Sequence, residues 1–348
     1  MKTAVVILNY NGEEHLKTFL PSVVENTPTA VEIIVADNAS TDSSLSLLHE
    51  SFPSVKILKL DHNYGFAGGY NRALKMIEAQ FYVLLNSDVA VTPGWLSPLI
   101  GRMKRSEKIT ACQPKIKSFR DKKSFEYAGA SGGFIDKNGF PFCRGRIFDH
   151  IERDIGQHDD EREIFWASGA CLIIRAEAFH EVCGFDETFF AHMEEIDLCW
   201  RLKNRGHSIY CFPESEVYHL GGGTLASTNS RKTYLNFRNN LSIIVRNDYH
   251  GSLLTKILKR LIFDGGAAFF MLFTKGPKHF FAVLRAHFFF YGNLRRLLRE
   301  RKHWQSLSET PNKSGFYRGS IVQDYFKDKK KVFGALATNL FVRQSRST

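Results

Sequence analysis

A short unbroken apolar run that ends abruptly in polar residues constrains this chain most. Residues 81–85 read FYVLL, and residues 86–88 read NSD. Such a run suits a strand buried on both faces in a parallel sheet, and open α/β sheets bind ligands beyond the carboxyl ends of their strands. A carboxylate there, such as Asp88, together with diphosphate oxygens, can hold Mg²⁺ or Mn²⁺. The competing interpretation is that Asp88 caps a helix starting near Pro93 or lies in a solvated turn.

Three apolar segments precede this run and alternate with stretches of helical periodicity. Residues 4–8, 32–36 and 55–60 are the predicted strands, and residues 13–25 form the first predicted helix. This alternation predicts an α/β fold with a mostly parallel central sheet, flanking helices and right-handed crossovers. Asn9, Asp37 and Asp88 follow three of the strands. Because the ends of parallel strands share one edge, we expect these side chains to converge on one pocket.

A nucleotide fits the chemistry of that edge. Asp37 offers an acceptor to a base or ribose, and Gly65, Gly68 and Gly69 in the stretch HNYGFAGGYN would let the backbone approach a ligand. The alternative for the glycines is a plain turn from loop to helix. The first strand is not followed by GxGxxG, and the chain has no GxxxxGK[ST], so neither a Rossmann cofactor site nor a P-loop is indicated.

Three carboxylates fall within four positions at Glu194, Glu195 and Asp197. Crowding and burial raise the pKa of such groups, and a raised pKa suits a general base for a hydroxyl. The alternative is an acidic first helical turn paired with Arg201. Upstream, residues 115–165 lose clean periodicity, and we expect an irregular excursion that shapes a substrate site.

Several ordered motifs resemble the family 2 glycosyltransferases with the GT-A nucleotide-diphospho-sugar transferase fold, and bacterial rhamnosyltransferase-type enzymes in particular. They span about residues 1–245. The motifs are VVILNYNG at the start, VADNASTD at 35–42, NYGFAGGYN at 63–71, LLNSDV at 84–89, SGACLIIR at 168–175, GFDETFF at 184–190, EEIDLCWR at 194–201 and YHLGGGT at 218–224.

The resemblance implies a role for each matching residue. It puts Asn9 at the entry to the nucleotide pocket, Asp37 and Asn38 beside the base, and Asn63, Gly65, Gly68 and Asn71 along the nucleotide-sugar. Asn86 stands where the family's DxD motif has its first Asp, so it would bind nucleotide and leave the cation to Asp88. His219 would complete the metal or diphosphate site, the alternative being a satisfied histidine at a strand end. The general base would be Glu195, with Glu194 or Asp197 as substitutes. The implied reaction is inverting transfer of a sugar from a nucleotide-diphospho-sugar to a hydroxyl of a saccharide or lipid-linked saccharide in cell-surface polysaccharide synthesis, assisted by Mg²⁺ or Mn²⁺.

The charge distribution divides the chain. From Gly251 onward there are 19 Lys and Arg against 5 Asp and Glu, a net charge of +14, so residues 1–250 carry −3 of the total of +11. We expect a catalytic domain at residues 1–245, with a nucleotide-binding half at 1–110 and an acceptor half at 111–245. A basic, Phe-rich helical extension would follow at 246–303, then a polar basic tail at 304–348 that includes a loose terminus.

Residues 251–303 alternate basic clusters with Phe-rich ones. That pattern is typical of a helix lying on anionic lipid, and the acceptor would then be a lipid-linked saccharide at the inner leaflet. The alternatives are that the Phe side packs on the catalytic domain or in a homodimer. No nucleic-acid-binding signature is present, so nucleic acid is not an expected partner.

Composition and targeting signals indicate the compartment. The six cysteines contain no CxxC pair, which favours reduced, buried thiols. No signal peptide and no run long enough for a spanning helix is evident. We therefore expect a cytoplasmic protein, peripheral on the inner face of the membrane if the basic segment binds lipid.

Two other functions compete with glycosyl transfer. A sugar-nucleotide pyrophosphorylase would need a basic, Gly-rich loop after the first strand, where residues 9–12 read NYNG. A non-catalytic membrane- or nucleic-acid-binding protein would need neither Asp88 nor Glu195.

Overall fold

The computed structural model describes residues 2–221, 229–308 and 310–342 of the chain. The main helices and strands are β1 Thr3–Asn9, α1 Glu13–Asn26, β2 Glu32–Asp37, α2 Ser44–Ser51, β3 Lys56–Lys59, α3 Gly65–Lys75, β4 Phe81–Asn86, β5 Val89–Val91, α4 Leu96–Arg105, β6 Ile109–Ser118, β7 Gly133–Asp136, β8 Pro141–Cys143, β9 Arg146–Ile147, β10 His150–Ile151, β11 Arg162–Ile164, β12 Cys171–Arg175, α5 Ala176–Glu181, α6 Glu194–Asn204, β13 Ser208–His219, α7 Ser230–Asn247, α8 Leu253–Thr274, α9 Pro277–Ser306 and β14 Phe316–Tyr317.

The central sheet is parallel only in its N-terminal half. Its strand order is β11-β13-β6-β12-β4-β1-β2-β3, with β5 beside β13. The predicted strands β1 to β4 pair in parallel. Beyond them, β12 is antiparallel to both β4 and β6, and β13 is parallel to β6 but antiparallel to β5 and β11. The α/β class is confirmed, and the sheet as a whole is mixed because β12 enters it after the long excursion, from the opposite end.

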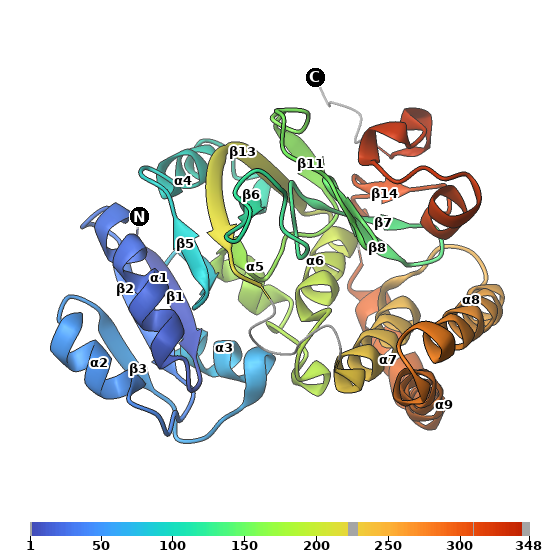
Figure 1. The fold of residues 1–348 in the computed structure, drawn as a ribbon, viewed down its shortest axis with the longest axis horizontal. Coiled ribbons are helices and arrows are strands. Elements are labelled where there is room, and N and C mark those ends of the chain that lie inside the picture. Colours follow the sequence, from blue (N-terminus) through green and yellow to red (C-terminus); the bar gives the residue numbers. More distant parts are fainter. Residues whose placement is uncertain (1, 222–228, 309, 343–348) are drawn as a thin grey trace.

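Helices cover both faces of this sheet (Figure 1). One core lies under α1, α2 and α4 and includes Leu16, Leu48 and Leu99. The other lies under α3, α5 and α6 and includes Tyr70 and Phe179. A strand between two helical layers is buried on both faces and must be apolar throughout. For this reason the apolar run at residues 81–85 could be predicted as a central strand.

The excursion between β6 and β11 is not irregular, as the lack of periodicity had indicated. It forms a second sheet in the order β10-β9-β8-β7-β14. Strand β14 comes from the C-terminal tail and pairs in parallel with β7. Phe333 and Phe341 of the tail pack on Phe134, with ring centroids 4.9 and 5.4 Å apart. Residues 310–342 of the predicted tail are therefore packed, because their aromatic side chains complete a core. The loose terminus is expected somewhere within residues 304–348, and residues 343–348 lie outside the described part.

The helices α7, α8 and α9 gather at one side of the sheet (Figure 1). Helices α7 and α9 share a small core of Leu241, Val245, Phe290 and Leu297. The boundary expected at residue 245 falls inside α7, so the extension continues a helix of the preceding segment. None of the described helices combines the length and apolarity needed to cross a bilayer. All six cysteines are unpaired, and five of them are buried.

Candidate active site

The first two strand ends meet as the parallel register requires. Asn9 and Asp37 are the last residues of β1 and β2 and stand opposite each other. The Asn9 amide nitrogen donates to an Asp37 carboxylate oxygen at 3.2 Å, and both side chains are buried. The amide oxygen of Asn9 is buried and has no hydrogen-bond partner among the residues that the structure describes. A Cβ at Gly12 would stand 2.3 Å from that oxygen, so glycine is required to keep the space beside it open.

The third strand end brings Asp88 against His219. Strand β5 pairs with the end of β13, Val89 opposite His219, and this pairing aligns residues 131 positions apart. The Nε2 atom of His219 lies 3.1 Å from Asp88 Oδ1, and its Nδ1 atom lies 3.5 Å from a Glu126 oxygen. All three side chains are buried. The imidazole thus lies between two carboxylates.

The electrostatics of this cluster follow from that arrangement. Burial lowers the pKa of His219, but the two carboxylates outweigh burial and raise the pKa to about 10. Burial raises the pKa of Asp88, but the hydrogen bond and charge of His219 more than offset it, so the pKa of Asp88 lies below its usual value. Both effects keep Asp88 ionised and His219 protonated until a competing cation arrives.

The residues present fit a divalent cation completed by substrate. The described residues hold no cluster of three or more His, Cys, Asp and Glu arranged as a metal site. Asp88 and His219 are nevertheless adjacent, and Glu126 stands behind the other ring nitrogen of His219, as carboxylates commonly stand behind ligating histidines. Two protein ligands leave positions that diphosphate oxygens can fill. Asp88 and His219 would hold the ion, with Glu126 orienting His219.

Glu194 and Glu195 begin α6 as a carboxylate pair with no neutralising partner among the described residues. One oxygen of each is buried without a hydrogen bond. Burial raises the pKa of Glu195 to about 7. Burial and the charge of Glu195 raise the pKa of Glu194 well above its usual value. A carboxyl with a pKa near 7, such as that of Glu195, can both lose and accept a proton at neutral pH, as a general base must.

The backbone that delivers this pair is strained. Phe190, His192 and Met193 have φ of 64°, 68° and 72°, in the left-handed region that side chains with a Cβ rarely adopt. Asn239 of α7 holds the segment by donating to the carbonyls of Ala191 and His192 at 3.0 and 2.7 Å. Such strain persists where neighbouring structure imposes it, commonly at functional sites.

Asp197, proposed above as a substitute base, has a different role. It is fully buried, and Arg201 and Arg246 donate to one of its oxygens, each at 2.8 Å. Asn247 donates to the other oxygen at 2.7 Å. A carboxylate held by two guanidinium groups and an amide cannot readily take a proton from a substrate. The alternative interpretation, pairing with Arg201, is the correct one for this residue.

The two carboxylate regions are linked across the sheet. Asn86, at the end of β4, donates its backbone N–H to Ala170 at 3.0 Å. The preceding residue, Gly169, lies so close to α6 that a Cβ built on it would stand 3.8 Å from the Cβ of Glu195. The edge formed by Asn9, Asp37 and Asn86 is therefore continuous with the start of α6.

The loop between β3 and α3 departs from expectation. Asn38 is buried and uses its amide to hold this loop, donating to Asn63 Oδ1 at 3.1 Å and to the Gly65 carbonyl at 3.0 Å. Asn71 is likewise occupied: it donates to the Phe185 carbonyl at 2.8 Å and accepts from the Phe185 N–H at 2.9 Å. Both side-chain amides hold neighbouring segments of the protein together. The structure therefore does not support a direct contact between Asn71 and a nucleotide-sugar.

The glycines of the same loop serve close packing. A Cβ at Gly65 would meet Phe190 at 3.3 Å, and one at Gly68 would meet Tyr64 at 3.0 Å and Arg72 at 3.1 Å. The absence of a Cβ at Gly65 and Gly68 leaves room for neighbouring protein atoms. This agrees with the alternative interpretation of the stretch as a turn from loop to helix.

Two site residues escaped the sequence analysis. Glu126 lies in the stretch without periodicity, and nothing in the sequence connects it with His219. His192 is half-buried, its Nε2 atom is buried with no hydrogen-bond partner among the described residues, and the partial burial lowers its pKa to about 4. Its position two residues before Glu194 is the only signal that could have drawn attention to it.

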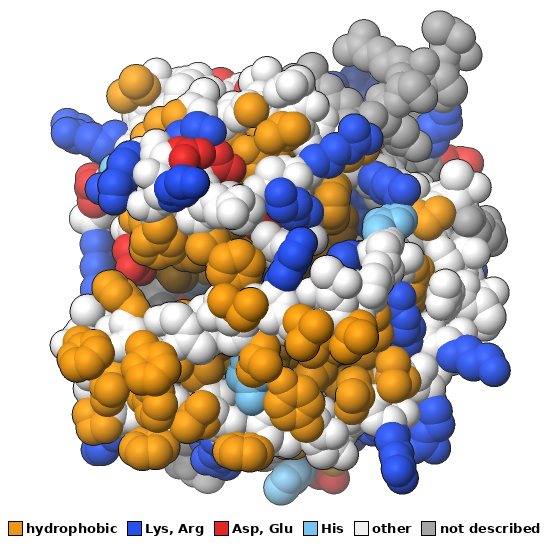
Figure 2. Space-filling model, turned by 90° about the vertical axis from the view of Figure 1, so that its right-hand side faces the viewer, with side chains coloured by type: hydrophobic (Ala, Val, Ile, Leu, Met, Phe, Trp, Pro, Cys, Tyr) orange, Lys and Arg blue, Asp and Glu red, His pale blue; other side chains and the backbone are white. Residues whose placement is uncertain are grey.

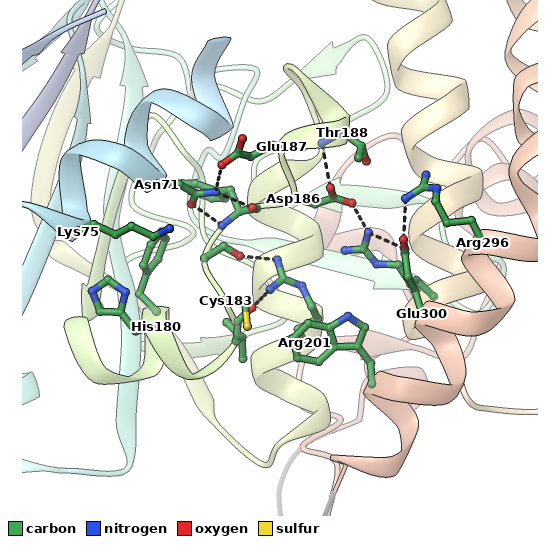
Figure 3. A pocket seen from close by; sticks show the side chains of 16 residues that line it. Asn71, Lys75, His180, Cys183, Asp186, Glu187, Thr188, Arg201, Arg296 and Glu300 are labelled. Atoms are coloured by element: carbon green, nitrogen blue, oxygen red, sulfur yellow. Dashed lines mark hydrogen bonds and ion pairs between the residues drawn. The ribbon is translucent and has the colours of Figure 1, made fainter. Parts of the chain in front are cut away.

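A cavity of about 530 Å³ lies away from the strand ends, between α3, the segment after α5, and α9 (Figure 3). Two of its arginines are already paired, Arg201 with the carbonyls of Val182 and Gly184 and Arg296 with Glu300. The lining includes none of Asn9, Asp37, Asp88, Glu194, Glu195 and His219, so this cavity is not the pocket expected at the strand ends.

Known proteins share the sequence pattern. A profile of Glycosyl transferase family 2 matches residues 4–183. An N-acetylglucosaminyl-diphospho-decaprenol L-rhamnosyltransferase of Mycobacterium tuberculosis is 30% identical over 233 residues, covering 62% of this chain and 75% of that protein. An O-antigen biosynthesis protein of Myxococcus xanthus is 26% identical over 223 residues, covering 63% of this chain and 17% of that protein.

Solved structures share the fold. GalNAc-T7 with UDP, GalNAc and Mn²⁺ has a TM-score of 0.56 at 16% identity, covering 71% of this chain and about half (48%) of its own length. S. aureus TarS 1–349 has a TM-score of 0.51 at 17% identity, covering 88% of both chains. The GT-A fold expected from the motifs is thus confirmed. Together with the family profile, it shows that this chain belongs to glycosyl transferase family 2 and is a glycosyltransferase.

Proposed function

We propose that the protein is an inverting, metal-dependent glycosyltransferase that moves a sugar from a nucleotide-diphospho-sugar to a hydroxyl of a saccharide or lipid-linked saccharide. One link supports the proposal most: Asn86, two residues before Asp88, donates its backbone N–H to Ala170, and the neighbouring Gly169 adjoins Glu195. The Asp88–His219 pair suits a leaving diphosphate, and the carboxylate pair of Glu194 and Glu195 suits an acceptor hydroxyl. The name of the mycobacterial relative, a rhamnosyltransferase with a diphospho-decaprenol acceptor, supports a lipid-linked acceptor.

The residues divide the chemistry as follows. Asn9 and Asp37 present amide and carboxylate oxygens to the nucleoside. Asp88 and His219 would hold the divalent cation, which would supply positive charge to the leaving diphosphate. Glu195 accepts the proton of the acceptor hydroxyl as the oxygen attacks the anomeric carbon from the face opposite the leaving group. Direct displacement needs no nucleophilic Ser or Cys, and buried Cys171 and Cys199, with pKa values raised by burial, are unsuited to that role.

The choice of Glu195 over Glu194 rests on accessibility. Glu195 is half-buried whereas Glu194 is buried, and a general base must lie within reach of the acceptor hydroxyl.

A binding screen tests the proposal directly. The unfolding temperature is measured with UDP-, GDP- and dTDP-sugars, with and without Mn²⁺, and any stabilising donor then enters a transfer assay with saccharide acceptors. We expect stabilisation by sugars of one base, increased by Mn²⁺ in the wild type and not in Asp88→Ala. Stabilisation by none of the nucleotide-sugars would contradict the proposal, and stabilisation by a nucleoside triphosphate with sugar 1-phosphate turnover would favour a pyrophosphorylase.

A further inference from the structure

Helix α8 buries an ion pair and exposes many of its apolar side chains. Its buried residues are Arg260, Asp264 and Ala268. Asp264 bonds Arg260 at 2.9 Å, and the second Asp264 oxygen lies 3.1 Å from His287 of α9. The Arg260 guanidinium also bonds Asn240 of α7 and stands 4.1 Å from the ring centroid of Phe140. These buried pairs fix α8 to its neighbours and leave its apolar side facing outward.

That outer side continues across α9 as one apolar face. The apolar face consists of the exposed side chains of Leu254, Leu258, Leu261, Ile262, Phe269, Phe270 and Phe273 on α8 and of Phe281, Leu284, Phe288, Tyr291 and Leu298 on α9. Phe273 is 84% exposed and Phe288 is 76% exposed. Figure 2 shows hydrophobic side chains gathered on this side of the molecule. Soluble monomers seldom expose a contiguous patch of this kind unless it binds something.

The charge around the apolar face has one sign. The exposed ionic side chains of residues 251–308 are Lys259, Lys275, Lys278, Arg285, Arg295, Arg299 and Lys302. The acidic residues of that range are Asp264, which is buried, and Glu300, which pairs with Arg296 and Arg246. Apolar side chains flanked by Lys and Arg match the interface of a bilayer that carries anionic headgroups.

We infer that the apolar face docks α8 and α9 flat onto an anionic phospholipid bilayer. A second copy of the chain is a poorer occupant, because a two-fold contact through the same face would bring the basic side chains of both copies together. Nucleic acid is also a poorer occupant, because its phosphates would meet phenylalanines at the centre of the face. The bilayer alone matches both the apolar centre and the basic surround.

The docked face would lie next to the candidate active site. The turn between α8 and α9 reaches the start of α7, where His279 Nδ1 lies 2.8 Å from Thr233 Oγ1. A hollow of about 220 Å³ at this turn is lined by Ser230, Lys275, Pro277 and Lys278 among others. In the same first turn of α7, Arg231 stands 4.9 Å from the ring of Phe190, which opens the strained segment before Glu195. This step rests on the proposed function: the position of the face would let a lipid-linked acceptor enter the candidate active site from the bilayer.

Vesicle sedimentation of the full chain tests the inference. Wild-type protein is mixed with phosphatidylcholine vesicles with and without phosphatidylglycerol, at low and high salt. We expect binding that requires phosphatidylglycerol and weakens with salt. The double variant Phe273→Glu with Phe288→Glu should bind at least about tenfold more weakly. The matched control, Met76→Glu with Ile155→Glu, changes side chains that are 64% and 85% exposed elsewhere and should bind as wild type does.

Each other outcome overturns the inference. Absence of wild-type binding at low salt would do so, as would equal loss in the control variant. A wild-type dimer that the Phe273→Glu, Phe288→Glu variant converts to a monomer would assign the face to a second copy. Salt-sensitive retention of nucleic acid by the face would assign it to that partner. Sedimentation does not depend on turnover, so failed binding with retained transfer to a soluble saccharide leaves the proposed function intact, and the reverse result isolates failure of the chemistry.

Discussion

The two ends of the candidate active site bury carboxylates in opposite ways. At the β5 end, Asp88 lies beside a histidine whose pKa is raised to about 10, so the negative charge is compensated before any ligand arrives. At the start of α6, Glu194 and Glu195 lie together with no cationic partner in the described part of the chain, and burial raises their pKa values instead. The difference shows that the protonation and the role of a buried carboxylate depend on the groups that contact it, and not on its place in the sequence.

Asp197 makes the same point within a single helical turn. It lies two residues from Glu195 on α6, yet two arginines and an amide hold it. Compensated carboxylates bind charge or stabilise the fold, and uncompensated ones accept protons. Each experiment below changes one member of this contrast.

The largest effect is expected from Glu195→Gln. The amide cannot accept a proton, so kcat/KM for transfer should fall by about 10²–10⁴-fold while stabilisation by the nucleotide-sugar is kept. Glu177→Gln, an exposed change on α5, serves as the control and should leave transfer unchanged. Full activity in Glu195→Gln together with loss in Glu194→Gln would move the base to Glu194.

Asp197→Ala should destabilise the protein by about 3–5 kcal/mol, because Arg201 and Arg246 would keep buried charges without their shared partner. Urea denaturation measures the loss. Asp328→Ala, which removes an exposed carboxylate from the tail, is the comparison and should change the unfolding free energy by less than about 0.5 kcal/mol. If Asp197→Ala lowered the free energy of unfolding by as little as Asp328→Ala does, the ion pairs of Asp197 would not be required for the stability of the fold.

Glu126→Gln should lower the affinity of the candidate site for a divalent cation without removing a ligand of that cation. Losing the carboxylate behind His219 typically reduces metal affinity by about 10–100-fold. Mn²⁺ titrations of the nucleotide-sugar thermal shift give the apparent affinity. Unchanged Mn²⁺ dependence would show that Glu126 does not orient His219, and the same assay on Asp88→Ala gives the limit for a lost ligand.

Transfer should rise with pH through about 7, the pKa of Glu195. Below that value Glu195 holds a proton and cannot take another, so kcat/KM should fall about tenfold per pH unit, and above it the rate should level off. A profile of kcat/KM at constant ionic strength measures the midpoint. A midpoint near the ordinary glutamate value would mean that the base is a solvated carboxylate rather than Glu195.

The smallest effect is expected on stability from Glu194→Gln. A buried carboxyl with a raised pKa binds protons more tightly when folded than when unfolded, so its cost is absent below about pH 4.5 and grows as pH rises. Removing it should raise the unfolding temperature at pH 8 and raise it by less at pH 5. Unfolding temperatures at the two pH values provide the test, and a loss of stability at pH 8 would show that the carboxyl makes favourable contacts.

Local pattern predicted the elements whose environment is uniform. The strand at 81–86 and the helix at 13–26 appear where their periodicity placed them, because a strand between two helical layers must be apolar throughout and a covering helix must be apolar on one side. Residues 115–165 could not be predicted in this way. Their short strands alternate with tight turns, and their pairing partner β14 lies at residues 316–317.

The sequence by itself determined the parallel half of the sheet and the order of polar residues at its edge, because unbroken apolar strands permit only one kind of burial. Only the tertiary structure decided what those polar residues do. Asp88 meets His219 through the pairing of β5 with β13, and Asp197 meets Arg246 of α7. Arg260 and Asp264 of α8 are buried because Asn240 and His287 supply their partners. Protonation and pairing depend on neighbours that folding brings from distant parts of the chain, and a local pattern contains no record of them.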